Sequence, residues 1–214
     1  MNAERIALDE LVARPWKNGA GLTREVAVAP RDATLERFDW RISVARIDRD
    51  APFSAFPGVD RCIALLRGDG MRLRSDDGAV DARLVTVGEP FGFAGEAALA
   101  ATVVDGPCDD FNVMVRRGHW QAEVTCIDSE QRLPSSDAAL LLALDGAWRC
   151  DTADGLLLPR HAWLWRMKLP PATVVPATPD SRALLVRLSC HDRAMSHRSA
   201  SKANSGERST EHGP

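Results

Sequence analysis

The chain has 214 residues, of which 45% are hydrophobic and 27% charged, and its formal net charge is −3. This length and composition are typical of a soluble globular protein with a substantial core, built as one large all-β domain or as two small ones. No long basic run is present, so nucleic acid is not expected as a partner.

The cysteines and the N-terminus predict the compartment. Five cysteines are widely spaced without a C-x-x-C pair, which favours reduced thiols over a disulfide framework or a zinc site. The opening MNAERIALDE lacks the apolar segment of a secretory signal, and no run approaches the roughly 18 apolar residues of a membrane helix. We therefore expect a cytoplasmic protein that does not bind a membrane.

Short apolar runs predict a succession of strands. The runs are rich in Val, Ile and Leu, and Gly, Pro or Asp separates each run from the next. Asp-Gly pairs between several of them predict hairpin turns, because glycine accepts a positive φ without strain. This pattern is typical of an all-β sandwich or barrel. In chain order, the predicted strands cover residues 39–47, 61–68, 83–87, 99–104, 111–117, 122–127, 138–144 and 182–189.

A faint internal repeat indicates two similar halves. Residues 63–78 align without gaps with residues 140–155, and both segments have the order strand, tight turn, strand, turn. Two β-barrels in tandem are the interpretation that we favour, and a single large sandwich is the alternative. From residue 191 onward the chain lacks Ile, Leu, Val and aromatic residues, which predicts a disordered tail over 191–214.

Motifs of several common enzyme classes are absent from the sequence. There is no Walker loop, no G-x-G-x-x-G after a strand, no G-x-S-x-G and no H-E-x-x-H. The only histidines before residue 191 are His119 and His161, and neither belongs to an H-x-H pair. A metal site needs several convergent ligands, so we predict no metal and no other cofactor.

The first candidate site is the stretch RPWKNGAGLTREVAV, residues 14–28. Asn18 lies in an Asn-Gly turn whose backbone amides can be exposed to a ligand. In the strand that follows, Thr23 and Glu25 are predicted to share one face, because alternate residues of a strand point the same way. The opposite face is predicted to carry the apolar residues Leu22, Val26 and Val28. A hairpin with solvated polar residues explains this stretch equally well.

The second candidate is the predicted strand WRISVARI, residues 40–47. Alternation places Arg41 and Ser43 on one face. A guanidinium on a strand with small neighbours suits an anion pocket, because it can bind a carboxylate through two parallel hydrogen bonds. An outer face with a surface arginine is the alternative.

The third candidate is the loop APFSAFPGVDR, residues 51–61. Its prolines and apolar anchors, Phe53 among them, predict a rigid segment that packs on the protein as a lid, as a wall or as a plug at a barrel end. Ser54 and Arg61 are the polar groups that this loop can offer.

The fourth candidate is CDDFNVMVRRG, residues 108–118. Asp110 and Asn112 are predicted to share one face of a strand, although both residue types are poor strand formers. Their presence indicates either a ligand site or a polar network that closes a barrel.

Together these stretches resemble the HutD/Ves family, a group of cupin-like proteins associated with histidine utilisation in bacteria. WKNGAGLTRE is similar to the family's W-x-N-G-G-G-x-T-x-E motif, and FDWRISVARI to its W-R-x-S-x-A strand. PFSAFPGVDRCIALLRGDG is similar to its F-S-x-F-P-G-x-D-R loop, and DGPCDDFNVMVRRG to its D-F-N-V-M strand. The resemblance is specific over residues 14–118, loose over 119–190 and absent from the tail.

The resemblance implies an all-β double-stranded β-helix with two cupin barrels in one chain, a bicupin. It implies a first barrel with the pocket over 1–118 and a second, sharing strands with the first, over 119–190. The family usually has glycine where Ala20 stands, and alanine would strain the turn if a positive φ were needed there. Carried over position by position, the expected ligand-binding residues are Asn18, Thr23, Glu25, Arg41, Ser43, Phe53, Ser54, Arg61, Asp110 and Asn112.

The resemblance also implies a small carboxylate ligand, with a formylated intermediate of histidine breakdown as a candidate, and a regulatory or housekeeping role. The alternative function is a metal-independent isomerase, lyase or hydrolase with Glu25 and Asp110 as acid and base, which needs one carboxyl with a raised pKa. A regulatory protein that binds another protein through an apolar patch is the third possibility. A monomer and a homodimer both stay open.

Overall fold

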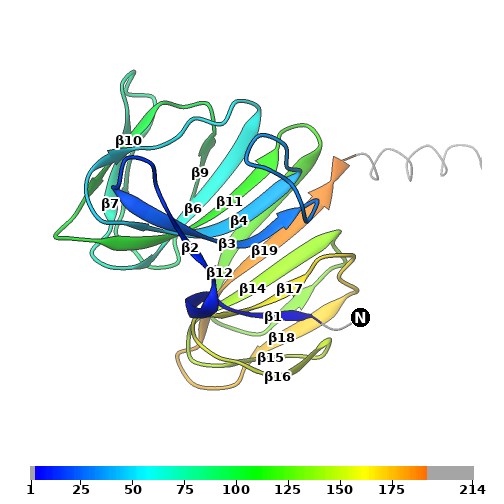
Figure 1. Ribbon diagram of the computed structural model, residues 1–214. Coiled ribbons are helices and arrows are strands. Elements are labelled where there is room, and N and C mark those ends of the chain that lie inside the picture. Colours follow the sequence, from blue (N-terminus) through cyan, green and yellow to red (C-terminus); the bar gives the residue numbers. More distant parts are fainter. Residues whose placement is uncertain (1–2, 192–214) are drawn as a thin grey trace, which may run out of the picture.

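The computed structural model describes residues 3–191, and this part of the chain consists of β-strands joined by turns and loops, with one short 3-10 helix at Leu8–Glu10 (Figure 1). The prediction of an all-β protein is confirmed. Of the tail over 191–214, only His191 lies within the described residues. No helix in the described range is long and apolar enough to cross a membrane.

Two sheets form what we call the first sandwich, in the upper part of Figure 1. The larger sheet contains, in spatial order, β2 (Ala13–Pro15), β3 (Gly21–Ala29), β4 (Trp40–Ile47), β11 (Cys108–Arg116), β6 (Val59–Arg67) and β9 (Pro90–Ala94). The smaller sheet contains β5 (Ala51–Pro52), β10 (Leu99–Val103), β7 (Met71–Ser75) and β8 (Asp81–Leu84). An apolar core that includes Ile47, Ile63, Leu73 and Leu99 lies between these two sheets.

Two further sheets form the second sandwich, in the lower part of Figure 1. The larger sheet contains β1 (Glu4–Ala7), β17 (His161–Trp165), β14 (Ala138–Asp145), β19 (Arg182–Cys190) and β12 (Trp120–Ile127). The smaller sheet contains β13 (Gln131–Leu133), β18 (Ala172–Pro176), β15 (Trp148–Cys150) and β16 (Ala153–Leu157). The core between them includes Trp148, Trp163 and Trp165.

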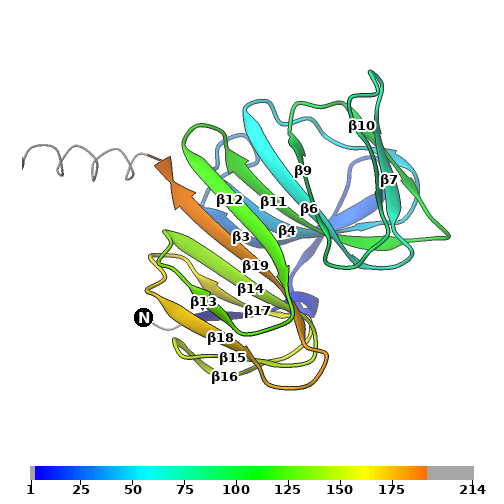
Figure 2. The ribbon, with the colours of Figure 1, turned by 180° about the vertical axis from the view of Figure 1, so that it is seen from behind.

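The larger sheets of the two sandwiches pack against each other, as the view from behind also shows (Figure 2). Trp40, Ile42 and Val44 of β4 meet apolar residues of β14 and β19 in this third core. Because the larger sheets are covered on both faces, their central strands read as continuous apolar runs. This explains why β14 is the uninterrupted AALLLAL, and the prediction of a strand rather than a helix at this run is confirmed.

The N-terminal strand belongs to the second sandwich, although the strands that follow it in the chain belong to the first. Residues 4–7 form β1, which pairs with β17 at the edge of the second sandwich, whereas β2 begins the first. Sequence periodicity cannot reveal this exchange, because it depends on a pairing between residues more than 150 positions apart.

Because of a β-bulge in β3, the prediction that Val28 shares a strand face with Val26 is wrong. Glu25 pairs with Ser43, but Ala27 pairs with Ile42, so one extra residue is inserted between them. Val26 and Ala27 therefore both join the core between the sandwiches. Val28 lies opposite Arg41, on the face that looks into the first sandwich, and not on the face of Val26.

Candidate ligand-binding site

The inner face of the six-stranded sheet carries most of the predicted site residues. The side chains of Ile47, Ile63 and Leu65 on this face belong to the core of the first sandwich, which fixes the direction in which their row neighbours point. Strand register then brings together Thr23, Glu25, Arg41, Ser43, Arg61, Asp110 and Asn112. The predicted shared faces are thus confirmed for these residues, while their role in binding stays a prediction.

The register places the polar residues in rows across neighbouring strands. Glu25 of β3, Ser43 of β4 and Asn112 of β11 lie side by side in one row. In the adjacent row, Met114 of β11 lies between Arg41 of β4 and Arg61 of β6. Asp110 follows in a third row, between Ala45 and Leu65. Four strands, β3, β4, β6 and β11, therefore contribute to one polar surface.

Arg41 is held in place by its neighbours on this surface. Its Nε donates to Oε2 of Glu25 at 2.9 Å, and its Nη1 donates to Oγ of Ser43 at 3.3 Å. The side chain of Arg41 is 11% exposed and that of Glu25 35% exposed. These two bonds use two of the five N–H groups of the guanidinium, which leaves donors for a further anionic group.

Arg61 lies in an aromatic cage. The centre of its guanidinium is 5.4 Å from the ring centroids of Phe53 and Phe56 and 4.9 Å from that of Phe93. Its Nη1 donates to the backbone carbonyl of Ser54 at 3.2 Å. Burial lowers the pKa of Arg61 to about 10, and the charge of Asp110 opposes that shift. Arg61 is therefore a buried cation that fastens the 53–58 loop to the sheet.

Asp110 and Asn112 are buried without partners for their oxygens. Asp110 is 1% exposed and Asn112 8% exposed. Within residues 3–191, the two carboxylate oxygens of Asp110 and Oδ1 of Asn112 accept no hydrogen bond. Burial raises the pKa of Asp110 to about 7, while Arg61 lowers it and Asp109 raises it further. Buried polar atoms are normally hydrogen-bonded, which makes these unpaired oxygens a candidate position for a bound group.

The polar groups of Asn18 in the β2–β3 turn form hydrogen bonds within the protein. Oδ1 of Asn18 accepts the N–H of Ala20 at 3.0 Å, and its carbonyl accepts Nη2 of Arg49 at 3.1 Å. The positive φ of this turn, 65°, belongs to Gly19. Ala20 is not among the residues with a positive φ, so alanine causes no strain at this position.

Three predicted residues do not lie in the polar rows. Asn18 is exposed in the turn just described. Ser54 is also exposed, and its backbone carbonyl accepts a hydrogen bond from Arg61. Phe53 contributes a ring of the aromatic cage.

Trp16, Phe56 and Phe93 also belong to this region, although they are not among the residues predicted from the sequence. Nε1 of Trp16 donates to Oγ1 of Thr23 at 2.8 Å, which orients the hydroxyl on the inner face. Phe56 and Phe93 complete the cage around Arg61. The alternation in PFGFA (90–94) was a signal that Phe91 and Phe93 share a face, but only the pairing of β9 with β6 places Phe93 beside Arg61.

No group of three or more His, Cys, Asp or Glu side chains within residues 3–191 is arranged to hold a metal ion. His161 lies in β17, in the second sandwich, and its Nδ1 contacts the carbonyl of Pro159 at 3.0 Å. The prediction of a site without metal remains a prediction.

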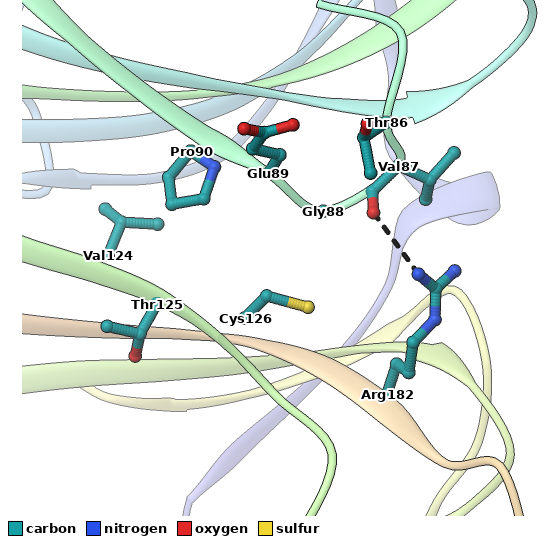
Figure 3. Close-up of a pocket in the computed structure, with 9 residues that line it drawn as sticks. All are labelled: Thr86, Val87, Gly88, Glu89, Pro90, Val124, Thr125, Cys126 and Arg182. Carbon is teal, nitrogen blue, oxygen red and sulfur yellow. Dashed lines mark hydrogen bonds between the residues drawn. The ribbon is translucent and has the colours of Figure 1, made fainter.

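A cleft of about 420 Å³ lies elsewhere, between the β8–β9 connection and strands β12 and β19 (Figure 3). Nη1 of Arg182 spans it and donates to the carbonyl of Val87 at 3.3 Å. Partial desolvation raises the pKa of the exposed Cys126, whose thiol is therefore not activated as a thiolate. None of the ten predicted residues lines this cleft. Its lining residues are Thr86, Val87, Gly88, Glu89, Pro90, Val124, Thr125, Cys126 and Arg182.

The polar surface, the turn that precedes it and the 53–58 loop all lie within a segment that matches a known family model. The model, HutD, matches residues 8–183. The chain belongs to the HutD family. The resemblance found in the four sequence stretches is thereby confirmed, and it extends over most of the second sandwich as well.

Two relatives of this family member are similar in sequence. A 21.2 kDa protein in the hutC 3′ region of Pseudomonas putida is 37% identical over 130 residues, which are 60% of this chain and 66% of that protein. Protein Ves of Citrobacter koseri is 37% identical over 153 residues, which are 70% of this chain and 76% of Ves.

Solved structures support the same assignment. The structure of HutD from Pseudomonas fluorescens SBW25 has a TM-score of 0.76 and 26% identity, and the match covers 88% of this chain and 98% of that one. A cupin 2 conserved barrel domain protein from Leptotrichia buccalis has a TM-score of 0.54 at 12% identity, over 88% of this chain and 98% of that one. The second likeness shows the fold alone: this HutD family member has a cupin-like β-sandwich fold.

Proposed function

We propose that this HutD family member is a bicupin that binds a small carboxylate metabolite on the inner face of its first barrel, without a metal. The observation that carries this proposal is Arg41, a nearly buried cation whose remaining N–H groups lie on the same surface as the unpaired oxygens of Asp110 and Asn112. Arginine is suited to carboxylates because its planar fork matches both carboxylate oxygens.

The bicupin interpretation is supported by the repeat. Residues 63–78 contain most of β6 and all of β7, and residues 140–155 contain the corresponding β14 and β15. We accordingly assign the first barrel to 1–118 and the second to 119–190, with β1 exchanged to the second. The core of the second barrel includes Trp148, Trp163 and Trp165, whereas the inner face of the first barrel carries the polar rows, so we propose the first barrel as the one that holds the ligand.

We propose a regulatory or housekeeping role in histidine utilisation, inside the cytoplasm. The support comes from two relatives, the Pseudomonas fluorescens HutD and the Pseudomonas putida protein in the hutC 3′ region. A formylated intermediate of histidine breakdown is the candidate ligand, because it combines a carboxylate with a small polar group.

A metal-independent enzyme is the second candidate function. Asp110 favours it, since a carboxyl with a pKa of about 7 suits proton transfer at neutral pH. Glu25, its proposed partner, is bound to Arg41 and serves first as a charge partner. Turnover of a histidine-pathway acid by the wild-type protein, lost in Asp110→Asn, would establish this alternative.

The binding function is tested by a thermal-shift screen of histidine-pathway intermediates and other small carboxylates. A ligand should raise the melting temperature with its concentration, because it binds the folded state alone. Arg41→Ala should abolish this response. Arg46→Ala is the matched control, because Arg46 lies on the same strand but pairs with Asp48 at the surface. The binding function is overturned if no carboxylate stabilises the protein, or if both variants respond as the wild type does.

A further inference from the structure

The second sandwich carries an ion pair on the inner face of its larger sheet. Nη2 of Arg187 on β19 donates to Oε2 of Glu123 on β12, and the strand register places these two residues opposite each other. Arg187 points inward, because Leu185, two positions earlier on β19, belongs to the core between the two sheets. Arg41 and Glu25 form the same kind of pair between two adjacent strands of the first sandwich.

The row that contains this ion pair continues to a buried tryptophan. Ala139 of β14 lies opposite Arg187 on one side and opposite Trp165 of β17 on the other, in strands that Figure 2 shows side by side. Ala139 and Trp165 both belong to the core of the second sandwich. Trp165 is 3% exposed, and its Nε1 has no hydrogen-bond partner within residues 3–191.

Ser136 adds a second unpaired group at the same end of the sandwich. It is 8% exposed, and its Oγ has no hydrogen-bond partner among the described residues. Ser136 lies just before β14 and forms a β-bridge with Leu169, just after β17. The side chain of Leu169 belongs to the core of the second sandwich, so the hydroxyl of its bridge partner faces the same interior.

These groups call for a partner that accepts hydrogen bonds. An indole N–H donates and never accepts, and the bond to Glu123 uses only one of the five N–H groups of Arg187. Glu123 does not reach the indole of Trp165, because three inter-strand spacings of about 4.8 Å separate β12 from β17. Ala139, the residue between Arg187 and Trp165, has no acceptor in its side chain.

The exposure of the ion pair selects the charge of this partner. The side chain of Glu123 is 56% exposed and that of Arg187 26% exposed, so water screens the negative charge more than the positive one. The interior side of the pair is therefore the positive side. The two inter-strand spacings between β19 and β17, about 4.8 Å each, match the span of one carboxylate with a hydrogen bond of about 2.8 Å on either side.

We propose that the second sandwich has an anion site of its own, in which Arg187, Trp165 and Ser136 bind a small carboxylate. The site is distinct from the polar surface of the first sandwich, and it goes beyond the proposed function. Glu123 is a positioning residue: it holds the guanidinium in place, and its own charge weakens the binding of an anion.

The indole N–H signals of the ¹⁵N-labelled full chain test this proposal by NMR. The signal of Trp165 is assigned by its absence in Trp165→Phe, and the probes are acetate and its neutral analogue acetamide. Acetate should shift this signal until it saturates, whereas acetamide should bind about tenfold more weakly or worse, because a charged acceptor makes the stronger hydrogen bond. Arg41→Ala should leave the titration unchanged, since Arg41 lies in the first sandwich.

Trp148 is the internal control in the same spectra. It is fully buried and its Nε1 also has no partner within the described range, but it lies on β15 between Leu157 and Pro176, with no cation beside it in that row. Its signal should not follow the acetate titration. Equal shifts of the Trp148 and Trp165 signals would mean a general response of the protein to salt, which overturns the site.

Two substitutions of the ion pair should act in opposite directions. Arg187→Met should weaken the binding of acetate about tenfold or more, the value of a charge-assisted hydrogen bond. Glu123→Gln removes the competing negative charge and should tighten it about two- to fivefold. Arg149→Met is the matched control for loss of an arginine, because Arg149 lies on the exposed outer face of β15 in the same sandwich.

Several results would overturn this site. They are a Trp165 signal that acetate does not shift, equal affinities for acetate and acetamide, and equal effects of Arg187→Met and Arg149→Met. A shift that disappears in Arg41→Ala reports binding in the first sandwich and excludes a second site, while the proposed function stands. If Arg187→Met does not fold, Glu123→Gln decides, because acetate binding that is unchanged or weaker in this variant contradicts the proposal.

Discussion

Arg41 on β4 donates to Glu25 on β3 at 2.9 Å, and the β-bulge between Glu25 and Ala27 lies beside this contact. The bulge adds one residue to β3, so that Val28, and not Ala27, lies opposite Arg41. Glu25 stays in register with Ser43, the other acceptor of Arg41. With this bulge, the Arg41 guanidinium has Val28 as an apolar neighbour and the side chains of Glu25 and Ser43 as hydrogen-bond acceptors.

The ion pair between Arg41 and Glu25 should contribute to the stability of the folded protein. A double-mutant cycle with Arg41→Ala and Glu25→Ala should give a coupling free energy of about 1 kcal/mol, because the pair is only partly buried. Urea denaturation of the four proteins measures it. Arg46 and Asp48, an exposed pair at 2.8 Å, form a comparison cycle that should give a smaller value. A coupling near zero for Arg41 and Glu25 would show that their contact does not organise the site.

Asp110 should make stability depend on pH. Its pKa is about 7 in the folded protein and 3.8 ordinarily, so the folded state holds the proton more strongly. The stability that this carboxyl contributes is fully present below about pH 3.8 and is lost as the pH rises through about 7, where the buried group becomes charged. The loss is at most roughly 4 kcal/mol.

The measurement is the free energy of unfolding at several pH values between 5 and 8, for the wild type and Asp110→Asn. The wild type should lose stability relative to the variant as the pH rises. Asp109→Asn supplies the control for removal of a neighbouring carboxylate. Parallel curves for the wild type and Asp110→Asn would mean that Asp110 does not titrate in this range.

Arg61 should be required for stability through the charge of Asp110. Arg61→Met keeps a long side chain inside the cage of Phe53, Phe56 and Phe93 but leaves Asp110 as an uncompensated buried charge. Because the charge of Arg61 lowers the pKa of Asp110 and so favours its ionised form, loss of that charge should destabilise the protein more at pH 8 than at pH 5. Denaturation experiments measure it.

Asp110→Asn should rescue much of the loss caused by Arg61→Met, because the second substitution removes the charge that Arg61 compensates. The rescue should be large at pH 8 and small at pH 5, where Asp110 is mostly protonated. Additive effects of the two substitutions at pH 8 would contradict this interpretation.

The Asn-Gly-Ala-Gly turn should tolerate change at one position and not at the next. A Cβ on Gly21 would lie 2.1 Å from the carbonyl oxygen of Arg46, so Gly21→Ala should destabilise the protein by about 1–3 kcal/mol or more. Ala20→Gly, the residue usual in the family, should cost about 0.5–1 kcal/mol, because Ala20 needs no positive φ. Thermal denaturation distinguishes the two. A tolerated Gly21→Ala would show that β3 and β4 can separate at this end.

Much of the fold follows from local pattern. Alternation along WRISVARI separates Trp40, Ile42 and Val44 from Arg41 and Ser43, and the structure keeps this division. Alternation failed at Val28, because a bulge shifts the period by one residue and carries no clear signal in the sequence. The candidate site was found as four separate stretches, yet Phe93 and Trp16 were missed because their partners lie elsewhere along the chain.

The sequence alone determined that this is an all-β chain, which runs of residues have two faces, and which polar residues lie on each face, because strand periodicity is a local property. Tertiary structure alone decided that β1 joins the second sandwich, that Arg61 lies among three phenylalanines and that Asp110 is buried between Ala45 and Leu65. These features depend on strand register between distant segments, and register is set by how whole sheets pack rather than by any one stretch of residues.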